Sequence, residues 1–466
     1  MARRKQQNKA AARKSRTRRA ASTSAAQVRM YRQGLGDCFL ITIPRAKSQP
    51  FYIMIDCGVV LGTSNAAARM NEVLADIVSI TAGHVHLLVV THQHWDHLSG
   101  FLQARSLFET LKIDNVWLAW TENPNDALAK KLKEEHRRLH LALAAGCARM
   151  HLDGGTDSTL DNLMEFLGGP GQGTTEQALE VIRKRCDQPR FCLPTDPPIQ
   201  LEGTDARLYV LGPPHDEDLI RRFNPSQAHP ETYGLAAMFL DKLAPVITAP
   251  DDNAPFDRIA GIPFTVAQQM PFFQSYYWGE APETQIQAVE SGSPVEIDQS
   301  WRRIDGEWLS ATSAFALQLD SATNNTSLVL AIELGTSEVL LFAADAQVGN
   351  WLSWQDLSWE VNGKKVTGPD LLNRTVLYKV GHHGSHNGTL QDKGLELMTH
   401  LKLALIPVDH EVAVKKHWIN MPLGRLEQRL NELTKGRVLR VDKDIPAALV
   451  GQVTEGKSKL YYEVAI

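Results

Sequence analysis

The sequence feature that most constrains this chain is a run of histidines directly after a short apolar segment. The mainly apolar residues 86–90 predict a buried β-strand, and the polar run that follows contains His92, His94, Asp96 and His97. Side chains two residues apart in an extended chain point to the same side, so His92 and His94 can bind one ion together. Asp96 and His97, on the turn that follows, can face a second ion. Imidazole and carboxylate groups at this density favour zinc, manganese or iron over calcium or magnesium.

Composition places the chain among ordinary globular proteins, since 43% of its 466 residues are hydrophobic and 22% are charged. No apolar run approaches the length that crosses a bilayer, and no apolar segment follows the basic N-terminus. We therefore expect neither a membrane anchor nor a secretory signal. The five cysteines are irregularly spaced, which indicates packed thiols in a reducing compartment rather than disulfides. These features together predict a cytoplasmic protein.

The N-terminal residues 1–26 form a basic arm with nine lysines and arginines and no acidic residue. Such a segment cannot bury enough apolar surface to fold, so we expect it to be disordered. It can bind the phosphates of nucleic acids without sequence preference. An organelle transit peptide and a solubilising tail are the alternatives. The formal net charge of the whole chain is −4, so the part that follows the arm is strongly acidic.

Further metal-binding residue types follow other apolar segments. Asp56 comes directly after residues 51–55, and we expect it to orient metal ligands by accepting their hydrogen bonds. A turn-initiating aspartate is the alternative for this position. Asp345 follows another apolar segment, and His382 and His383 follow a third. A helix is predicted at 65–79, between the apolar residues 51–55 and the predicted strand at 86–90.

In combination, these motifs resemble the metallo-β-lactamase superfamily of metal-dependent hydrolases. The opening Gly34-Leu-Gly-Asp and the segment Lys379-Val-Gly-His-His-Gly-Ser are similar to the branch typified by the hydrolase domain of the competence protein ComEC. The resemblance covers roughly 27–110 and 320–465. It implies an α/β fold, namely a four-layered αββα sandwich. It also implies one hydrolase domain over 27–465, with large insertions at about 121–205 and 216–318.

The same resemblance implies a ligand set for one or two zinc ions, with manganese possible. Asp345 would bridge the ions, and His382 would complete the second site because it comes first after its strand. His383 would then lie nearer the substrate. The expected metal ligands are therefore His92, His94, Asp96, His97, Asp345 and His382.

One departure from the superfamily concerns the first ion. Most members carry a metal-binding histidine about twenty residues before the bridging aspartate, but residues 323–330 contain none. The candidates for the missing ligand are His215, which follows a predicted strand, and His229. The alternative is a single firm site formed by Asp96, His97, Asp345 and His382.

Two further features have open interpretations. The aromatic cluster at 272–278 can stack bases, dock a protein partner or simply pack against the core. Trp351, Trp354 and Trp359 are expected to be core residues. His417, after the predicted strand at 403–409, is a candidate group on the substrate side, with a basic surface cluster as the alternative.

The function implied is metal-assisted hydrolysis, and a phosphodiesterase or nuclease is the first expectation. Asp96 or Asp345 can take a proton from water, and His383 or His417 can assist the leaving group. Carboxyl esters, lactones and phosphorylated small molecules are the alternative substrates. A non-catalytic, metal-containing protein that binds a partner is the alternative of a different class.

Overall fold

The computed structural model of the protein describes residues 25–46, 48–152, 168–169, 173–226, 231–232 and 320–466. The basic arm up to residue 24, His229 and the aromatic cluster at 272–278 lie outside the described residues. The roles predicted for them therefore stay predictions.

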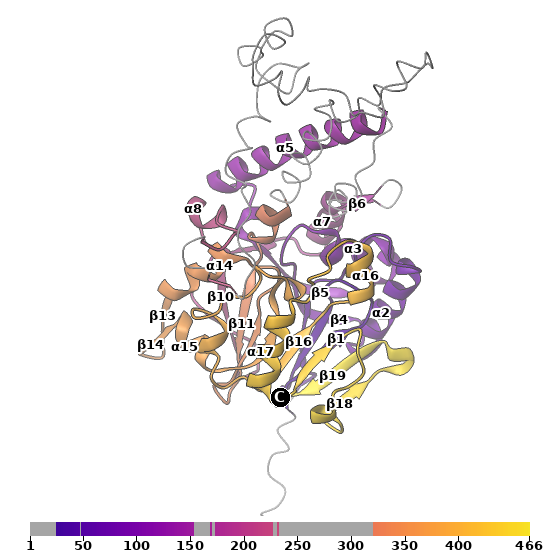
Figure 1. Ribbon diagram of the computed structural model, residues 1–466. Helices are drawn as coiled ribbons and strands as arrows, with labels where there is room; N and C mark the ends of the chain where they lie inside the picture. Colours follow the sequence, from indigo (N-terminus) through magenta and orange to yellow (C-terminus); the bar gives the residue numbers. More distant parts are fainter. Residues whose placement is uncertain (1–24, 47, 153–167, 170–172, 227–230, 233–319) are drawn as a thin grey trace, which may run out of the picture.

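Two large mixed β-sheets form the centre of the molecule (Figure 1). The first sheet has eight strands in the order β18-β19-β1-β2-β3-β4-β5-β8. Their bounds are β1 Gln27–Tyr31, β2 Phe39–Ile43, β3 Phe51–Ile55, β4 His84–Val89, β5 Lys112–Ala119, β8 Arg190–Cys192, β18 Val453–Glu455 and β19 Tyr461–Ala465. The pairs β3–β4, β4–β5 and β5–β8 are parallel. Both faces of these strands are covered, which explains the nearly continuous apolar run of β4.

The second sheet has seven strands in the order β17-β16-β15-β12-β11-β10-β9. Their bounds are β9 Ile199–Gln200, β10 Arg207–Gly212, β11 Val329–Glu333, β12 Val339–Phe342, β15 Thr375–Lys379, β16 Leu403–Ile406 and β17 Val438–Arg440. The strands β12, β15, β16 and β17 are parallel to one another. Two small hairpins pair β6 Gly168–Gly169 with β7 Gly173–Thr174, and β13 Ser358–Val361 with β14 Lys364–Thr367.

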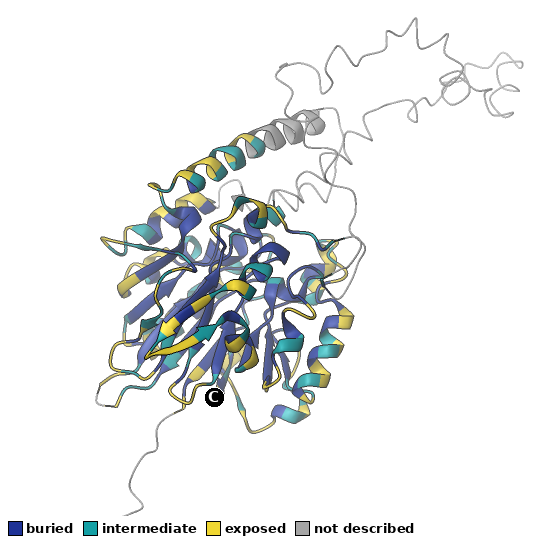
Figure 2. Cartoon of the chain, turned by 90° about the vertical axis from the view of Figure 1, so that its left-hand side faces the viewer, coloured by how far each residue is buried: buried dark blue, intermediate teal, exposed yellow. Residues whose placement is uncertain are grey.

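The sheets pack face to face, with helices against their outer faces. The rings of Phe39 and Phe342 meet edge to face at 5.5 Å within one core that draws side chains from both sheets. Two more cores join each sheet to its helices, and in Figure 2 the exposed residues gather on those helices and on the loops. Helices α2 Ala66–Ile80, α3 Trp95–Gln103, α4 Arg105–Phe108 and α7 Thr175–Arg183 belong to the first sheet, and α14 Val348–Ser353, α15 Gly368–Asn373, α16 His410–Lys415 and α17 Gly424–Thr434 to the second.

The α/β class predicted from the sequence is confirmed by these mixed sheets and helices. The helix predicted at 65–79 is α2, and Trp351, Trp354 and Trp359 are buried as expected. Helices α5 Ala127–Leu152 and α8 Glu217–Ile220 lie in the predicted insertions. Strands β8 and β9 also come from the segment predicted as the first insertion, and each adds an edge strand to one sheet. These strands are only two or three residues long, so their local sequence carries no clear strand signal.

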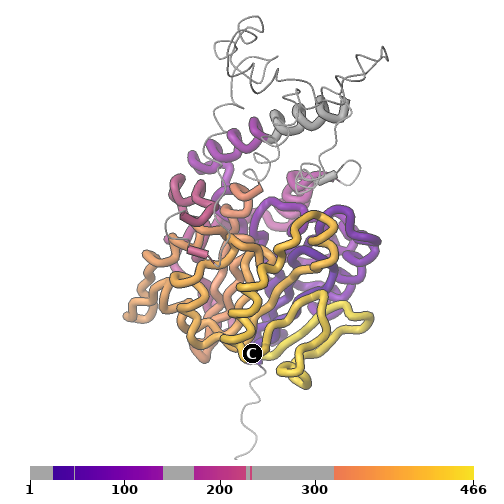
Figure 3. The backbone as a smooth tube through the Cα atoms, viewed as in Figure 1, coloured from indigo at the N-terminus to yellow at the C-terminus, as the bar shows by residue number. Residues whose placement is uncertain are grey.

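The two ends of the described chain lie side by side, because β1 pairs antiparallel with β19 (Figure 3). Among the described helices, none combines the length and apolar character that a bilayer crossing requires. The four cysteines with described side chains are free thiols.

One edge of the structure collects the carboxyl ends of parallel strands from both sheets. The amide of Leu328, just before β11, donates to the carbonyl of Thr91, just after β4, at 2.8 Å. This bond joins the two sheets where β3, β4, β12 and β15 end. In α/β proteins, ligands usually bind at such strand ends.

Candidate metal centre

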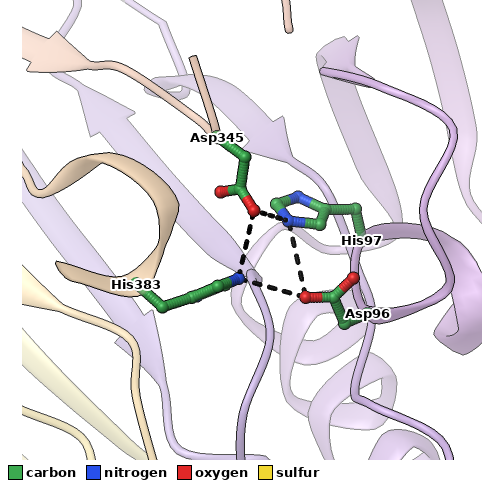
Figure 4. Close-up of side chains that lie close together, drawn as sticks. All are labelled: Asp96, His97, Asp345 and His383. Carbon is green, nitrogen blue, oxygen red and sulfur yellow. Dashed lines mark hydrogen bonds and ion pairs between the residues drawn. The ribbon is translucent and has the colours of Figure 1, made fainter. Parts of the chain in front are cut away.

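Four buried side chains meet at this edge and form the candidate metal centre: Asp96, His97, Asp345 and His383 (Figure 4). One ligand atom from each lies within 4.8 Å of the others. Two come from the first sheet and two from the second, so the centre forms only when the sheets pack together.

Local backbone geometry places each of these side chains. His94 is extended (φ −109°, ψ 153°) and begins α3, so Asp96 and His97 lie in the first turn of that helix. Asp345 follows β12 after Ala344, which has a left-handed backbone with φ 48°. His383 lies in the short turn Gly381–Gly384 after β15, also with a left-handed backbone, at φ 50°.

Two glycines allow the backbone to pass close behind Asp96 and His97. A Cβ atom on Gly36 would lie 2.5 Å from the carbonyl oxygen of Asp96, and one on Gly58 would lie 2.4 Å from the same atom. The amide of Asp37 donates to that carbonyl at 3.1 Å, and the amide of Cys57 donates to the carbonyl of His97 at 2.9 Å. The Gly-Leu-Gly-Asp and Asp-Cys-Gly segments thus hold the turn that carries both ligands.

The distances within the centre suit a shared ion. His383 Nε2 lies 3.0 Å from Asp96 Oδ2 and 3.3 Å from Asp345 Oδ2. His97 Nε2 lies 3.4 Å from Asp345 Oδ2 and 3.7 Å from Asp96 Oδ2. Two imidazole nitrogens and two carboxylate oxygens therefore face one point.

Hydrogen bonds behind the centre decide which imidazole nitrogens face it. His97 Nδ1 donates to Asp56 Oδ2 at 2.8 Å, and His383 Nδ1 donates to the carbonyl of Pro407 at 3.0 Å. Each Nε2 is therefore turned towards the carboxylates. Asp56 is held in turn by the amide and hydroxyl of Thr91, at 2.8 and 2.6 Å. These are the contacts that a residue orienting His97 would make, and the role itself stays a prediction.

Charge and unpaired atoms indicate that the centre fits a cation. His97 Nε2 and Asp96 Oδ1 are buried and have no hydrogen-bond partner among the described residues. Burial alone would lower the pKa of His383, but Asp345 and Asp96 raise it to about 10. Burial also lowers the pKa of His97, but the negative charges of Asp345 and Asp96 outweigh this effect. They hold the pKa of His97 well above its usual value. Without a metal, protons on the two histidines balance the carboxylates, and a metal ion would displace them.

A buried lysine anchors one ligand of the centre. Lys379, at the end of β15, is 1% exposed, and its Nζ donates to Asp345 Oδ1 at 3.3 Å and to the carbonyl of Ala344 at 2.9 Å. The same ammonium lies 2.6 Å from Asp37 Oδ2. Asp37, Asp56 and His97 form a further group with metal-ligand geometry, but Lys379 already supplies the positive charge there. Sequence analysis missed Lys379, although a lysine that ends an apolar strand is a signal that it has a buried partner.

His92 and His94 lie beside the centre. His92 Nε2 is 3.1 Å from His94 Nδ1, and the ring of His92 is 4.2 Å from that of His97. Burial is the main cause that lowers the pKa of His92 well below its usual value and that of His94 to about 3. Both rings are therefore neutral, as metal ligands must be.

His383, rather than His382, joins the candidate metal centre. Residues 382 and 383 both have left-handed backbones, with φ 47° and 50°, so the chain coils and the second ring turns to the carboxylates. His382 Nε2 instead lies 3.3 Å from Asn324 Nδ2, and its Nδ1 lies 3.2 Å from Asn387 Oδ1. The expectation of His382 as the ligand rested on its coming first after the strand, but the left-handed turn brings His383 to the carboxylates instead.

Two other candidate histidines are not brought into the centre. His215 Nε2 lies 2.9 Å from Asp126 Oδ2, and its ring packs 4.3 Å from that of Trp120, in a separate cluster. His417 is exposed, on the turn that follows α16, with φ 64°. Sequence position after a strand was the reason for both expectations, but the turns lead these side chains elsewhere.

A third cluster with metal-ligand types lies elsewhere on the first sheet. His84, His86 and Asp114 approach one another, but Lys112 Nζ lies 3.1 Å from Asp114 Oδ1 and Arg45 Nη1 lies 3.3 Å from His86 Nε2. Two positive side chains at these distances disfavour a metal ion.

Comparisons with known proteins find no relative whose site could be set beside this geometry. The sequence matches no protein-family model, and a search of curated proteins gives no significant match.

Proposed function

We propose that the protein is a metal-dependent hydrolase of the metallo-β-lactamase type that cleaves phosphodiesters, as a phosphodiesterase or nuclease does. The observation that carries this proposal is the candidate metal centre, in which two imidazole nitrogens and two carboxylates face one buried point. Two packed sheets with helices on both outer faces support the corresponding fold, a four-layered αββα sandwich.

The residues that would hold zinc or manganese are His97 and His383 through Nε2, with Asp345 and Asp96 through carboxylate oxygens. A bound ion of this kind lowers the pKa of its water to about 7 and polarises the oxygen under attack. The chain keeps the ligands in position: Asp56 holds His97, the carbonyl of Pro407 holds His383, and Lys379 holds Asp345.

The geometry favours an exchange of the roles expected for the two adjacent histidines. His383 would be the ligand, and His382 would lie on the substrate side. Burial is the main cause that lowers the pKa of His382 to about 4, so its ring is neutral at pH 7. Asp96 Oδ1, which is buried and unpaired, is placed to accept a proton from attacking water.

The carboxylates of the centre also affect how an anionic substrate can bind. An anionic phosphodiester would be repelled by Asp96 and Asp345 unless cations neutralise them. Cations at such a site stabilise the charge that develops on both the attacking and the leaving oxygen. The same ions are therefore required both for substrate binding and for cleavage.

The described residues give little support to the alternative of a non-catalytic, metal-containing protein that binds a partner. Trp351, Trp354 and Trp359 are buried and offer no docking surface. A partner site on the aromatic cluster at 272–278 stays a prediction.

The test is hydrolysis of bis(p-nitrophenyl) phosphate by protein reconstituted with zinc or manganese, alongside elemental analysis of metal content. We expect a chelator to abolish cleavage and His97→Ala to lose both metal and turnover. His215→Ala removes an exposed histidine that belongs to a separate cluster, so this variant should retain both metal and turnover. Turnover retained in His97→Ala would contradict the site. Cleavage of p-nitrophenyl acetate but of no phosphodiester would instead favour an esterase.

A further inference from the structure

The cluster around His86 lies at the end of the first sheet that is opposite to the candidate metal centre. His84 and His86 stand at the start of β4, whereas the metal centre is built on residues that follow the end of that strand. Lys112 is the first residue of β5. Arg45 follows β2, which runs antiparallel to β3 and so brings Arg45 to the same end of the sheet. The two positive side chains that disfavour a metal ion here favour an anion.

Arg45 carries N–H groups for which the described residues supply no acceptor. Its Nε and Nη2 atoms are buried and have no hydrogen-bond partner among those residues. The side chain is nonetheless held in place, since its Cζ lies 4.8 Å from the centre of the Phe51 ring and a Cβ atom on Gly203 would lie 3.4 Å from its Cδ. A buried donor left without an acceptor costs free energy. The guanidinium of Arg45 therefore fits an acceptor from outside the described chain.

His86 adds a further N–H group at the same point. The backbone amide of Tyr52 donates to His86 Nδ1 at 3.1 Å, so this nitrogen carries a lone pair. Burial is the main cause that lowers the pKa of His86 to about 4, so the ring is neutral at pH 7. The single hydrogen of the neutral ring is therefore on Nε2.

Two hydrogen-bond donors consequently face each other. His86 Nε2 lies 3.3 Å from Arg45 Nη1, and a guanidinium has no acceptor atom. With the hydrogen of His86 on Nε2, neither group accepts from the other, although the distance would allow a hydrogen bond. An oxygen that accepts from both N–H groups removes this mismatch. A negatively charged oxygen also balances the charge of Arg45.

The carboxylate of this cluster is engaged elsewhere. Asp114 Oδ2 lies 2.7 Å from His84 Nε2, and Asp114 Oδ1 lies 3.1 Å from Lys112 Nζ. Asp114 thus has two partners other than Arg45. The side chain of Lys112 is 71% exposed and adds a second positive charge at the rim of the cluster. Arg45 and Lys112 together outnumber the one carboxylate between them.

We propose that Arg45 and His86 form a binding site for a phosphate group, separate from the candidate metal centre. Arginine suits this ligand because its N–H groups form charge-assisted hydrogen bonds to phosphate oxygens. One phosphate oxygen accepts from Arg45 Nη1 and His86 Nε2, and Lys112 contributes its charge from the rim. The phosphate is either the free ion or the terminal group of a small ligand. This site does not depend on the proposed function.

The test is calorimetric titration of inorganic phosphate into the full-length, metal-free protein at fixed salt concentration. We expect saturable binding that Arg45→Met weakens by about 10-fold or more, because a hydrogen bond to a charged group is lost. Methionine keeps an apolar side chain against Phe51. The basic arm at 1–26 is the same in both proteins, so binding there does not account for the difference.

The matched control is Arg105→Met. Arg105 is exposed in its ion pair with Glu109, so this variant should bind phosphate as the unsubstituted protein does. Phosphate should also raise the thermal unfolding temperature of the unsubstituted protein and of this control, but not that of Arg45→Met. Equal affinity for phosphate in Arg45→Met, or no saturable binding to the unsubstituted protein, would overturn the inference.

The ring of His86 provides an independent readout. Nitrogen-15 NMR should show its hydrogen on Nε2 before phosphate is added, and the signal of this group should move during the titration. A hydrogen on Nδ1 would overturn the inference, because Nε2 would then accept from Arg45 and the mismatch would disappear.

A second titration, with adenosine monophosphate, identifies the source of the phosphate. Binding at least as tight as that of inorganic phosphate, and weakened in Arg45→Met, would support a phosphate group carried by a larger ligand. Binding of inorganic phosphate alone would support the free ion. Neither result involves hydrolysis of an ester, so this site and the proposed function are tested independently.

Discussion

Nδ1 of His97 lies 2.8 Å from Oδ2 of Asp56, and neither side chain is exposed to solvent. The bond connects the end of β3 to the first turn of α3. It also fixes the ring of His97 with Nε2 towards Asp345 and Asp96. A buried carboxylate that orients a metal ligand in this way should have a large effect on metal affinity.

Asp56→Asn is the first prediction from this relationship. An amide of similar size removes the negative charge that holds the His97 proton, so zinc affinity should fall by about 10- to 100-fold. Competition with a chromophoric chelator measures the change. Asp114→Asn, which removes the partner of the partly exposed His84, should leave affinity unchanged. Equal affinity in all three proteins would mean that Asp56 does not orient His97.

Zinc binding should release protons, and its affinity should rise with pH. The pKa of His383 is raised to about 10 from an ordinary value of 6.5, so this ring is protonated at neutral pH in the metal-free protein. A histidine must be neutral to bind a metal, so an ion held by His383 displaces its proton. His92 and His94, whose pKa values are lowered, contribute none. Calorimetry in buffers of different ionisation enthalpy measures the release, and heats independent of buffer would contradict it.

The same shift gives the pH dependence of folding stability. Because the folded-state pKa of His383 is raised, its contribution to the metal-free protein is complete below pH 6.5 and is lost as pH rises through about 10. The zinc-loaded protein should lack this decline. Denaturant unfolding at several pH values, with and without zinc, tests the difference.

Much of the candidate centre could be predicted because its residues follow apolar strands. Asp56, Asp345 and the run from His92 to His97 each begin within three residues of the end of a strand, and the carboxyl ends of parallel strands gather at one edge. The α/β class follows from the same pattern.

Other parts of the site depend on contacts that no local pattern encodes. The left-handed backbones of His382 and His383 decide which ring faces the carboxylates, and sequence spacing alone suggests the opposite order. His215 follows β10 but is drawn to Asp126, since the turn after a strand decides where the side chain points.

Lys379→Met should destabilise the metal-free protein more than the zinc-loaded protein. The substitution keeps the length of the side chain but leaves the buried carboxylates of Asp37 and Asp345 without their shared cation, which costs about 3–5 kcal/mol. Zinc should restore part of the loss by neutralising Asp345. Thermal unfolding with and without zinc measures this.

The control for this change is Lys402→Met. That lysine is 63% exposed in its ion pair with Glu338, so the free energy of unfolding should change by less than about 1 kcal/mol. An equally small effect of Lys379→Met would show that Asp37 and Asp345 do not need the lysine.

Gly58→Ala should weaken metal binding through the backbone alone. The added methyl group would lie 2.4 Å from the carbonyl carbon of Asp96 and 2.5 Å from the amide nitrogen of His97. The bond from the Cys57 amide to the His97 carbonyl prevents the two segments from separating freely. The turn that carries both ligands must therefore shift, at a cost of about 1–3 kcal/mol. The control is Gly424→Ala, at the start of α17, where no atom lies within 4 Å of the new Cβ. It should change neither the zinc affinity nor the free energy of unfolding appreciably. Chemical denaturation and zinc titration of both variants test this, and zinc affinity retained in Gly58→Ala would mean that the turn does not depend on this close packing.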